Sequence, residues 1–154
     1  MRAGRYAEFE RVAYKARLQG DTVRLILPSN VPRPEGWVDR SNHGQWTFDV
    51  PVTLVSRVFR VCTYARLDGV PVLVRNVDDG RGTASLYARQ SLPPWEAKRR
   101  ENRVHPELHV IDERGGRAEL VGEVLQTRLT DITESEVGDE QQCSPTTVEA
   151  SGID

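Results

Sequence analysis

The sequence predicts a mainly β protein in which two tandem, small SH3-like barrel units share an interface. Three observations support this: short stretches of alternating apolar and polar residues, turn residues between them, and a hairpin that recurs further along the chain. The 154 residues are enough for one ordinary domain or two very small ones. We divide the chain into a first unit (1–54), a second unit (55–133) and an acidic tail (134–154).

The first unit opens with a predicted β-hairpin at residues 8–27. Apolar and charged residues alternate up to Leu18, residues 19–21 (Gln-Gly-Asp) supply a turn, and the alternation resumes on the return strand. Residues 28–44 contain too many prolines and glycines for regular structure, so a loop is expected there. Another strand is predicted at 46–52, where apolar residues again occupy every second position.

The second unit begins with a repeat of this hairpin. A shift of 49 positions aligns residues 11–23 with residues 60–72, and seven of the 13 aligned positions are identical. The identical residues of the first copy are Arg11, Val12, Ala16, Arg17, Leu18, Gly20 and Val23. The apolar positions of the first copy keep their spacing of two residues in the second copy. Because residues two apart lie on the same face of a strand, both copies are expected to bury the same face. The alternative is that two arginine-rich hairpins look alike through narrow composition.

The rest of the second unit is predicted as further strands with one inserted helix. A turn is expected at 76–80, because Asp79-Gly80 tolerates the positive φ of a type I′ turn. A strand follows at 84–88, and then a short helix at about 93–101, which has prolines at its start and bases near its end. The last strands are predicted at 108–110 and 118–124, joined through Arg114–Gly116.

Charge is unevenly distributed along the chain. The net charge is −2, but residues 134–154 contain six acids and no base, which leaves 21 bases and 17 acids, or +4, for the rest. This tail lacks aromatic residues and periodicity, so we expect disorder. No apolar run approaches the ~20 residues of a membrane span, and the N-terminus has no apolar segment behind its basic residues. We therefore expect a cytoplasmic location and no membrane partner.

The sequence contains two cysteines, Cys62 in a strand-like run and Cys143 in the polar tail. Two cysteines so placed do not form a disulfide framework, and no Cys-x-x-Cys motif indicates zinc. We expect one buried and one incidental thiol, with a redox pair as the alternative.

No motif indicates an enzyme, a cofactor or a metal site. The run from His105 to His109 has proline where the zinc-protease motif needs glutamate, so a solvent-facing pair of histidines is expected. His43 lies in a glycine-rich loop and is interpreted as structural. Asp78 and Asp79 resemble a partial calcium loop, but no bidentate glutamate follows and the turn explains them.

Two tryptophans indicate a partner-binding surface. Trp37 lies near Arg33 in the proline-rich loop, and Trp95 lies near three bases in the predicted helix. Tryptophan together with arginine is enriched at binding hot spots. The candidate partner-binding residues are Arg33, Trp37, Asp78, Asp79, Trp95, Lys98, Arg99 and Arg100. The alternative is that each tryptophan folds back to cap its own barrel.

Residues 14–18, 20–25, 34–37, 46–51 and 64–72 resemble a group of small actinobacterial tandem-repeat β proteins that are encoded near secreted polymorphic toxins. The resemblance covers about residues 4–90, carries no catalytic signature and does not include the inserted helix or the tail. The excess of 19 arginines over two lysines is consistent with such a source.

The resemblance implies an immunity-type protein, a cytosolic binder that occludes the active site of a toxin. A nucleic-acid-binding small-barrel module is the alternative, suggested by arginine clusters at 57–66 and 98–100. A small enzyme is a third possibility.

Overall fold

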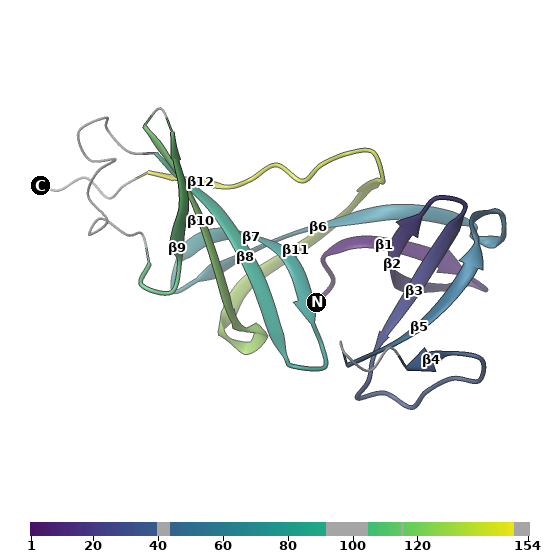
Figure 1. Cartoon of the computed structure of the whole chain (residues 1–154). Coiled ribbons are helices and arrows are strands. Elements are labelled where there is room, and N and C mark those ends of the chain that lie inside the picture. The colour runs from purple at the N-terminus through teal and green to yellow at the C-terminus, as the bar shows by residue number, and fades with distance from the viewer. Residues whose placement is uncertain (40–43, 92–104, 115, 150–154) are drawn as a thin grey trace, which may run out of the picture.

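The computed structural model describes residues 1–39, 44–91, 105–114 and 116–149, and it confirms a mainly β protein (Figure 1). The strands are β1 (Gly4–Phe9), β2 (Val12–Gln19), β3 (Thr22–Pro28), β4 (Val38–Asp39), β5 (Gln45–Pro51), β6 (Arg57–Leu67), β7 (Val70–Asp78), β8 (Thr83–Ser91), β9 (His109–Arg114), β10 (Arg117–Leu125), β11 (Leu129–Gly138) and β12 (Thr147–Glu149). Two single-turn 3₁₀ helices, Val52–Leu54 and Gln126–Arg128, complete the described elements. Within these ranges no helix is long and apolar enough to span a membrane. The helix predicted at 93–101 lies outside the described residues.

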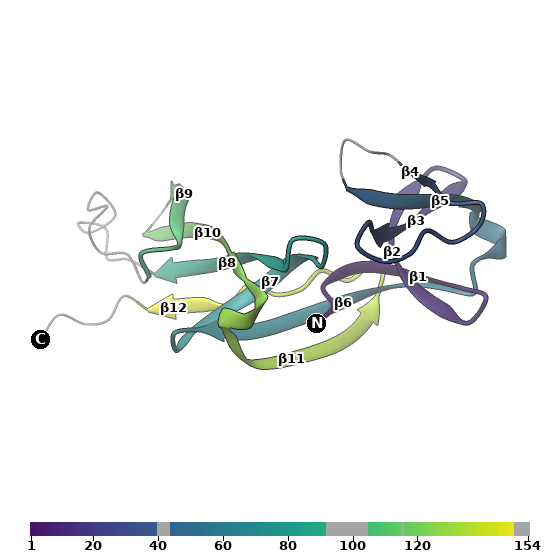
Figure 2. The same cartoon turned by 90° about the horizontal axis from the view of Figure 1, so that it is seen from below.

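All twelve strands belong to one sheet in the order β4-β5-β3-β2-β1-β6-β7-β8-β10-β9, with β11 added on β6 and β12 on β8. Strand β6 joins two lobes, because its first half pairs with β1 and its second half pairs with β7 along the same edge. Strand β11 lies antiparallel along the other edge of β6 (Figure 2). The predicted pair of SH3-like barrels is therefore not confirmed, since the described strands form one continuous sheet.

Each lobe has its own hydrophobic core. The first core gathers side chains of β1, β2, β3 and β5, with Leu25 and Val23 fully buried. The second core gathers β6, β7, β8, β10 and the start of β11, with Leu67, Leu86 and Leu120 fully buried. Burying one such aliphatic side chain contributes about 1.5–3 kcal/mol, so each lobe has a packed core of its own that holds its strands together.

The two copies of the repeated hairpin bury most of the predicted face, although Val12 of the first copy is exposed. Ala16 and Val23 lie in the first core, and their equivalents Ala65 and Val72 lie in the second. The pairing itself differs, because the two-residue loop is Gly20-Asp21 in β2–β3 but 68–69 in β6–β7. The turn of the second copy lies one residue earlier than the alignment with the first copy predicts. The cross-strand pairing is therefore shifted by two residues, and an even shift leaves the buried face unchanged.

Two turns differ from the prediction. Residues 8–27 do not form one hairpin, because the chain turns at Glu10 and Arg11, which have positive φ values of 51° and 67°. Neither is a glycine or asparagine, so composition gave no signal of the turn. The β7–β8 turn lies at residues 79–82, later than the predicted 76–80, and the positive φ belongs to Gly82 and not to Gly80. The type I′ turn expected at residues 79–80 is therefore wrong.

The acidic segment contains the second half of β11, which runs to Gly138, and β12, so the prediction of a disordered tail is wrong for residues 134–149. Strand β11 continues to Gly138, and its acids pair with arginines from the first lobe's end of the sheet. Arg2 pairs with Glu134 and Glu136, Arg57 with Glu136, and Arg5 with Asp139. The acids of this segment thus neutralise bases that lie far away in the sequence.

Cys62 and Cys143 form a disulfide across 81 positions of sequence, which corrects the expectation of two separate thiols. Strand β11 runs back along β6, and the chain then turns at residues 139–140 and returns over the sheet. This return brings Cys143 to Cys62 in the middle of β6. The bond fixes the returning segment to the central strand of the molecule.

Lys15 connects the two lobes. Its Nζ donates to the carbonyl oxygen of Val77, at 2.6 Å, and to the side-chain oxygen of Asn76. Burial lowers the pKa of Lys15, while the carboxylates of Asp79 and Asp78 act in the opposite direction. The ammonium group therefore holds the β2–β3 side of the first lobe to the end of β7.

Candidate functional site: an arginine-lined hollow

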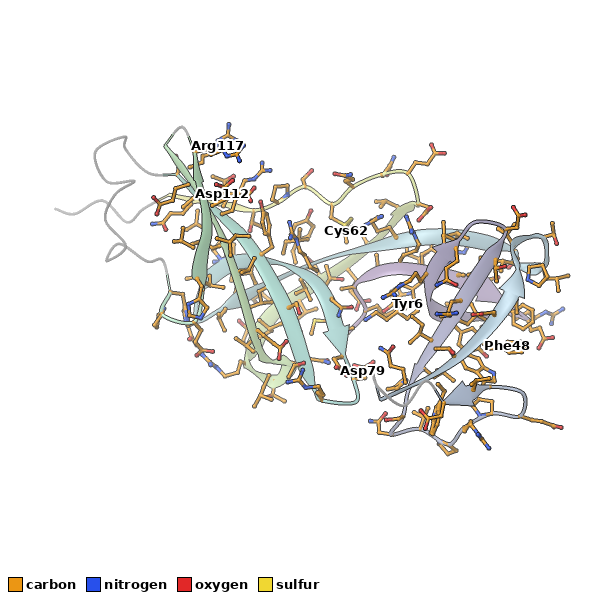
Figure 3. The ribbon with its side chains drawn as sticks, in the orientation of Figure 1. Tyr6, Phe48, Cys62, Asp79, Asp112 and Arg117 are labelled. Atoms are coloured by element: carbon orange, nitrogen blue, oxygen red, sulfur yellow. A yellow bond between two sulfur atoms is a disulfide. The ribbon has the colours of Figure 1, made fainter. Side chains whose placement is uncertain are left out.

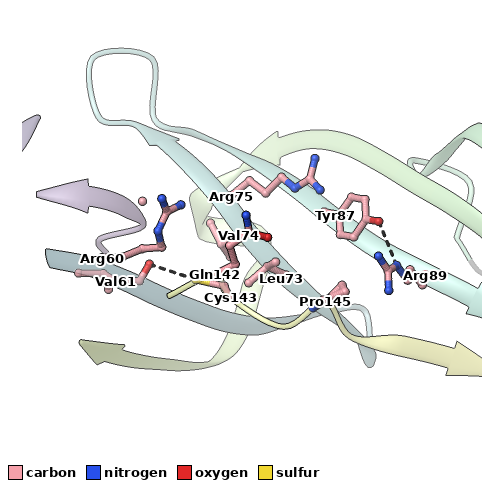
Figure 4. Close-up of a pocket in the computed structure, with 11 residues that line it drawn as sticks. Arg60, Val61, Leu73, Val74, Arg75, Tyr87, Arg89, Gln142, Cys143 and Pro145 are labelled. Carbon is pink, nitrogen blue, oxygen red and sulfur yellow. Dashed lines mark hydrogen bonds between the residues drawn. The ribbon is translucent and has the colours of Figure 1, made fainter. Parts of the chain in front are cut away.

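A hollow of about 340 Å³ lies on the face of the second lobe that is opposite its core (Figure 4). On β7 and β8, Val72, Val74, Leu86 and Ala88 point into the core. The alternate residues point to the other face. Those that line the hollow are Leu73, Arg75, Tyr87 and Arg89, with Arg60 from β6. Leu73 and Tyr87 are directly paired across the two strands and form its floor.

One wall of the hollow is the returning C-terminal segment, which contributes Gln142, Cys143 and Pro145. Backbone and side-chain hydrogen bonds hold this segment. The hydroxyl of Tyr64 donates to the carbonyl of Ser144 at 2.7 Å, and the backbone N–H of Arg89 donates to the carbonyl of Thr146 at 2.8 Å. Together with the disulfide, these contacts make the wall a defined surface.

Arg60 provides the clearest sign that the hollow binds something. Its Nε is buried and has no hydrogen-bond partner among the described residues. A buried donor without a partner costs about 1–3 kcal/mol, and more when the group is charged. An incoming acceptor that carries negative charge would remove this cost, so the site favours an anion.

Arg75 adds a second positive charge. It is the extra residue of a β-bulge between the pairs Val74↔Leu86 and Asn76↔Ser85. Its guanidinium carbon lies 3.7 Å from the centroid of the Tyr87 ring, a cation–π contact that holds the side chain over the floor of the hollow. Bulges commonly redirect side chains next to functional sites. No acid pairs with Arg75 in the described part of the chain.

Arg89 is the third arginine and is already partnered. Its Nε donates to the hydroxyl of Tyr87 at 3.2 Å, and that hydroxyl donates to Glu119 at 2.8 Å. The hydrogen bond with Tyr87, and then the charge of Glu119, raise the pKa of Arg89. The hollow thus holds three guanidinium groups, of which Arg60 and Arg75 lack an acidic partner among the described residues.

A second depression of about 260 Å³ adjoins the first through Arg89. It lies at the ends of β9 and β10, where Figure 3 labels Asp112 and Arg117. Here acids accompany the bases: Arg114 pairs with Asp112 at 3.3 Å, and Glu119 lies opposite Arg89. Its positive charge is therefore largely balanced, unlike that of the first hollow.

Of the residues predicted to bind a partner, the four that the structure describes make separate contacts. Trp37 is only 8% exposed and stacks on Phe48 within the first core, while Arg33 lies on the surface of the first lobe, 6.0 Å from the Trp46 ring. Asp78 accepts a hydrogen bond from the backbone of Arg81, and Asp79 accepts one from Gln126. The other predicted residues lie outside the described part of the chain: Trp95, Lys98, Arg99 and Arg100.

His105 is not part of a solvent-facing pair, because it is 7% exposed, whereas His109 is exposed. Its Nδ1 accepts from the backbone N–H of Glu107 at 3.1 Å, so its Nε2 carries the proton that is donated to Asp68 at 2.7 Å. Arg128 binds the same Asp68 and also Glu107. Both ring nitrogens are occupied, so the cluster fastens the segment before β9 to the β6–β7 turn. No group of three metal-ligating side chains occurs in the described ranges.

Asp68→Asn should change the pH dependence of stability. The hydrogen bond from His105 and the charge of Arg128 lower the pKa of Asp68 below its ordinary value of 3.8. A carboxylate whose pKa is lower in the folded chain stabilises the folded state at pH values above its pKa in the unfolded chain. This stabilisation is lost as the pH falls through its pKa in the folded chain. Wild type and variant should therefore differ in urea midpoint at about pH 7, and the difference should shrink as the pH falls below the ordinary carboxylate pKa of 3.8. Glu113→Gln, an exposed control, should show no such convergence; a constant difference for Asp68→Asn would contradict the assignment.

The hollow was missed from the sequence because its residues follow ordinary strand alternation. Arg60 and Cys62 on β6, like Tyr87 and Arg89 on β8, occupy every second position, which predicts an outward face and nothing more. Only the return of the C-terminal segment across that face turns it into a site. No family model, curated protein or solved structure matches the chain.

Proposed function

We propose that the chain is a non-catalytic binding protein that captures acidic side chains of a partner protein in the arginine-lined hollow. The observation that carries the proposal is the buried Arg60 Nε without a described partner, next to Arg75, which has no acid on it. Carboxylates form short, strong hydrogen bonds with guanidinium groups and fit their forked geometry. A volume of about 340 Å³ accommodates one or two acidic side chains rather than a whole domain.

The partner that we propose is a secreted polymorphic toxin, and the chain would be its immunity protein. This step rests on the resemblance to small actinobacterial proteins encoded near such toxins. Catalytic centres commonly use aspartate and glutamate. An arginine-rich anchor that engages such acids would let the surrounding surface cover the active site. Co-purification with the product of the neighbouring toxin gene, together with rescue of growth, is the direct test; the absence of both would exclude this partner.

Nucleic-acid binding is the second candidate function. Arg89 links the hollow to the depression that contains Arg114 and Arg117, so a run of bases extends along one end of the lobe. Such a run is typical of phosphate contacts. Asp112 and Glu119 stand among these bases and would repel a phosphate backbone. A single acidic side chain entering the first hollow avoids them, which favours a protein partner.

The cytoplasmic location expected from the N-terminus remains a prediction. The disulfide between Cys62 and Cys143 bears on it, because disulfides persist in oxidising compartments and are rare in a reducing cytosol.

Replacing Arg60 and Arg75 together by glutamine should weaken binding of a hexaglutamate peptide by at least about 100-fold. Each charge-assisted hydrogen bond contributes about 1.5–3 kcal/mol, and 1.4 kcal/mol corresponds to a factor of ten. Isothermal titration calorimetry measures the change. The control R17Q/R81Q removes the same charge from exposed positions outside the hollow and should bind as wild type does. Equal affinity of R60Q/R75Q and wild type would contradict the site.

The same calorimetry separates the two candidate functions. A protein-binding hollow predicts that Arg114→Gln leaves hexaglutamate affinity unchanged, since Arg114 lies in the second depression. Phosphate contacts along both depressions predict instead that a single-stranded oligonucleotide binds, that Arg114→Gln weakens it, and that affinity falls steeply with salt.

A further inference from the structure

The wall of the hollow depends on one covalent bond. Residues 139–146 contain no strand, and the regular pairing described beyond them is β12, which pairs through three residues with the end of β8. The segment also makes hydrogen bonds through Ser144 and Thr146, one of them from the Thr146 hydroxyl to the carbonyl of Pro71, and an ion pair between Arg5 and Asp139. The disulfide lies within this segment and joins it to the middle of β6.

Cys143 is both the tether and a lining residue. It contributes to the hollow directly, between Gln142 and Pro145, and it lies over Val61, whose carbonyl is 4.0 Å from its Sγ (Figure 4). Cys62 stands two positions after Arg60 on the same face of β6. Release of Cys143 would therefore remove part of the wall that faces the guanidinium group of Arg60.

We propose that capture of an acidic group in the hollow is controlled by the redox state of the Cys62–Cys143 pair. This inference rests on the proposed function of the hollow. In the oxidised chain the returning segment is fixed over the sheet, and the hollow has the enclosure that strengthens guanidinium–carboxylate bonds. In the reduced chain the segment is held by few bonds, the hollow opens to water, and the affinity for acids falls.

A dithiol reductant supplies the electrons and protons that the redox step needs. Its thiolate attacks Sγ of Cys143, the S–S bond breaks, and Cys62 leaves as a thiolate that takes up a proton. The second thiol of the reductant then displaces Cys143 from the mixed disulfide. Two electrons and two protons pass to the protein, which gains two thiols, and the reductant becomes a disulfide.

The hollow itself favours this exchange. Cys143 is half-buried where it lines the hollow, whereas Cys62 is only 5% exposed, so attack is directed to Cys143. Arginine side chains around a cysteine stabilise thiolate anions and so promote both attack and departure. The site that binds acids thus also makes its own tether accessible to reduction.

The test is calorimetric titration of the full chain with hexaglutamate before and after reduction. Dithiothreitol is the reductant because it is uncharged, and iodoacetamide then blocks the thiols without adding a carboxylate that would enter the hollow. The oxidised chain should bind at least about tenfold more tightly than the reduced one, which corresponds to the loss of roughly one charge-assisted hydrogen bond. The variant C62A/C143A should match the reduced chain and should not respond to dithiothreitol.

The outcomes distinguish this inference from the proposed function. Binding of equal or greater strength after reduction overturns the redox control and leaves acid capture intact. Failure of the oxidised chain to bind hexaglutamate overturns acid capture itself. Circular dichroism checks that the reduced chain keeps its sheet; if it does not, the titration is repeated in sucrose, which favours the folded state, and the same comparison decides.

Discussion

C62A/C143A is expected to lower the free energy of unfolding by about 4.5 kcal/mol, the chain-entropy value for a loop closed across 81 positions. The loop contains nearly all of the second lobe, so the disulfide restricts the unfolded chain far more than a local bond would. Urea denaturation of the oxidised wild type and the double variant measures the difference. Because small proteins have about 5–15 kcal/mol of stability in total, the variant should remain folded at room temperature but unfold at a much lower urea concentration.

Reduced wild type provides the matched comparison for this prediction. It has the same side chains as the oxidised chain and lacks only the bond, so its midpoint should lie close to that of the double variant. A loss below about 1 kcal/mol in both would show that the unfolded chain is not restricted as the entropy model requires. The slope of free energy against urea should also be larger without the bond, since a disulfide keeps the unfolded state compact.

Most strands of both cores could be predicted because an apolar residue stands at every second position, although β1, which contributes Ala7 to the first core, was not predicted. Ala16, Val23, Ala65 and Val72 stand at positions where alternation indicates burial, and the structure buries all four. The inward residues of β8, β10 and β5 follow the same rule. Period-two patterning is produced by burial on one side, so it finds such strands reliably.

Strand β11 could not be predicted for the same reason. From Thr130 to Glu136 every side chain is exposed, so both faces are polar and no alternation exists. The strand is held by backbone pairing with β6 and by ion pairs to Arg2 and Arg57. Arg2 lies more than a hundred positions before β11, and Arg57 lies some eighty positions before it. A local sequence pattern does not contain such distant partners. The acidic composition therefore indicated disorder where the fold supplies partners.

The candidate site also shows that local patterns can be predicted from the sequence whereas contacts between distant segments cannot. Tryptophan near arginine led to the prediction that Trp37 binds a partner, but its ring contacts are Tyr14 and Phe48 within its own lobe. The hollow, by contrast, is assembled from β6, β7, β8 and the segment that returns from β11. Cys143 of the disulfide lines the hollow, and two cysteines 81 positions apart show no local sign that they pair.

Gly122→Ala is the second change with a large expected effect. Gly122 lies in β10 opposite Leu86, and a Cβ at this position would stand 2.5 Å from the carbonyl oxygen of Glu107 and 3.0 Å from Leu108. The first of these is a backbone atom, so the clash cannot be relieved by a side-chain rotation. We expect a loss of about 2–3 kcal/mol, in the upper range for overpacking.

The consequence should extend from Gly122 to the cluster at the β6–β7 turn. Displacing Glu107 and Leu108 moves the fully buried Leu108 out of the second core and separates His105 from Asp68. Gly138→Ala is the matched control, because it is also a strand glycine but nothing lies within 4 Å of its added Cβ. That control should be neutral or slightly stabilising, since alanine restricts the unfolded chain more than glycine does. Urea midpoints and the NMR signals of the His105 ring measure both effects. If Gly122→Ala were as stable as Gly138→Ala and left the His105 ring unperturbed, the close approach of residues 105–108 to β10 would be wrong, because that approach alone makes glycine necessary in the middle of a strand.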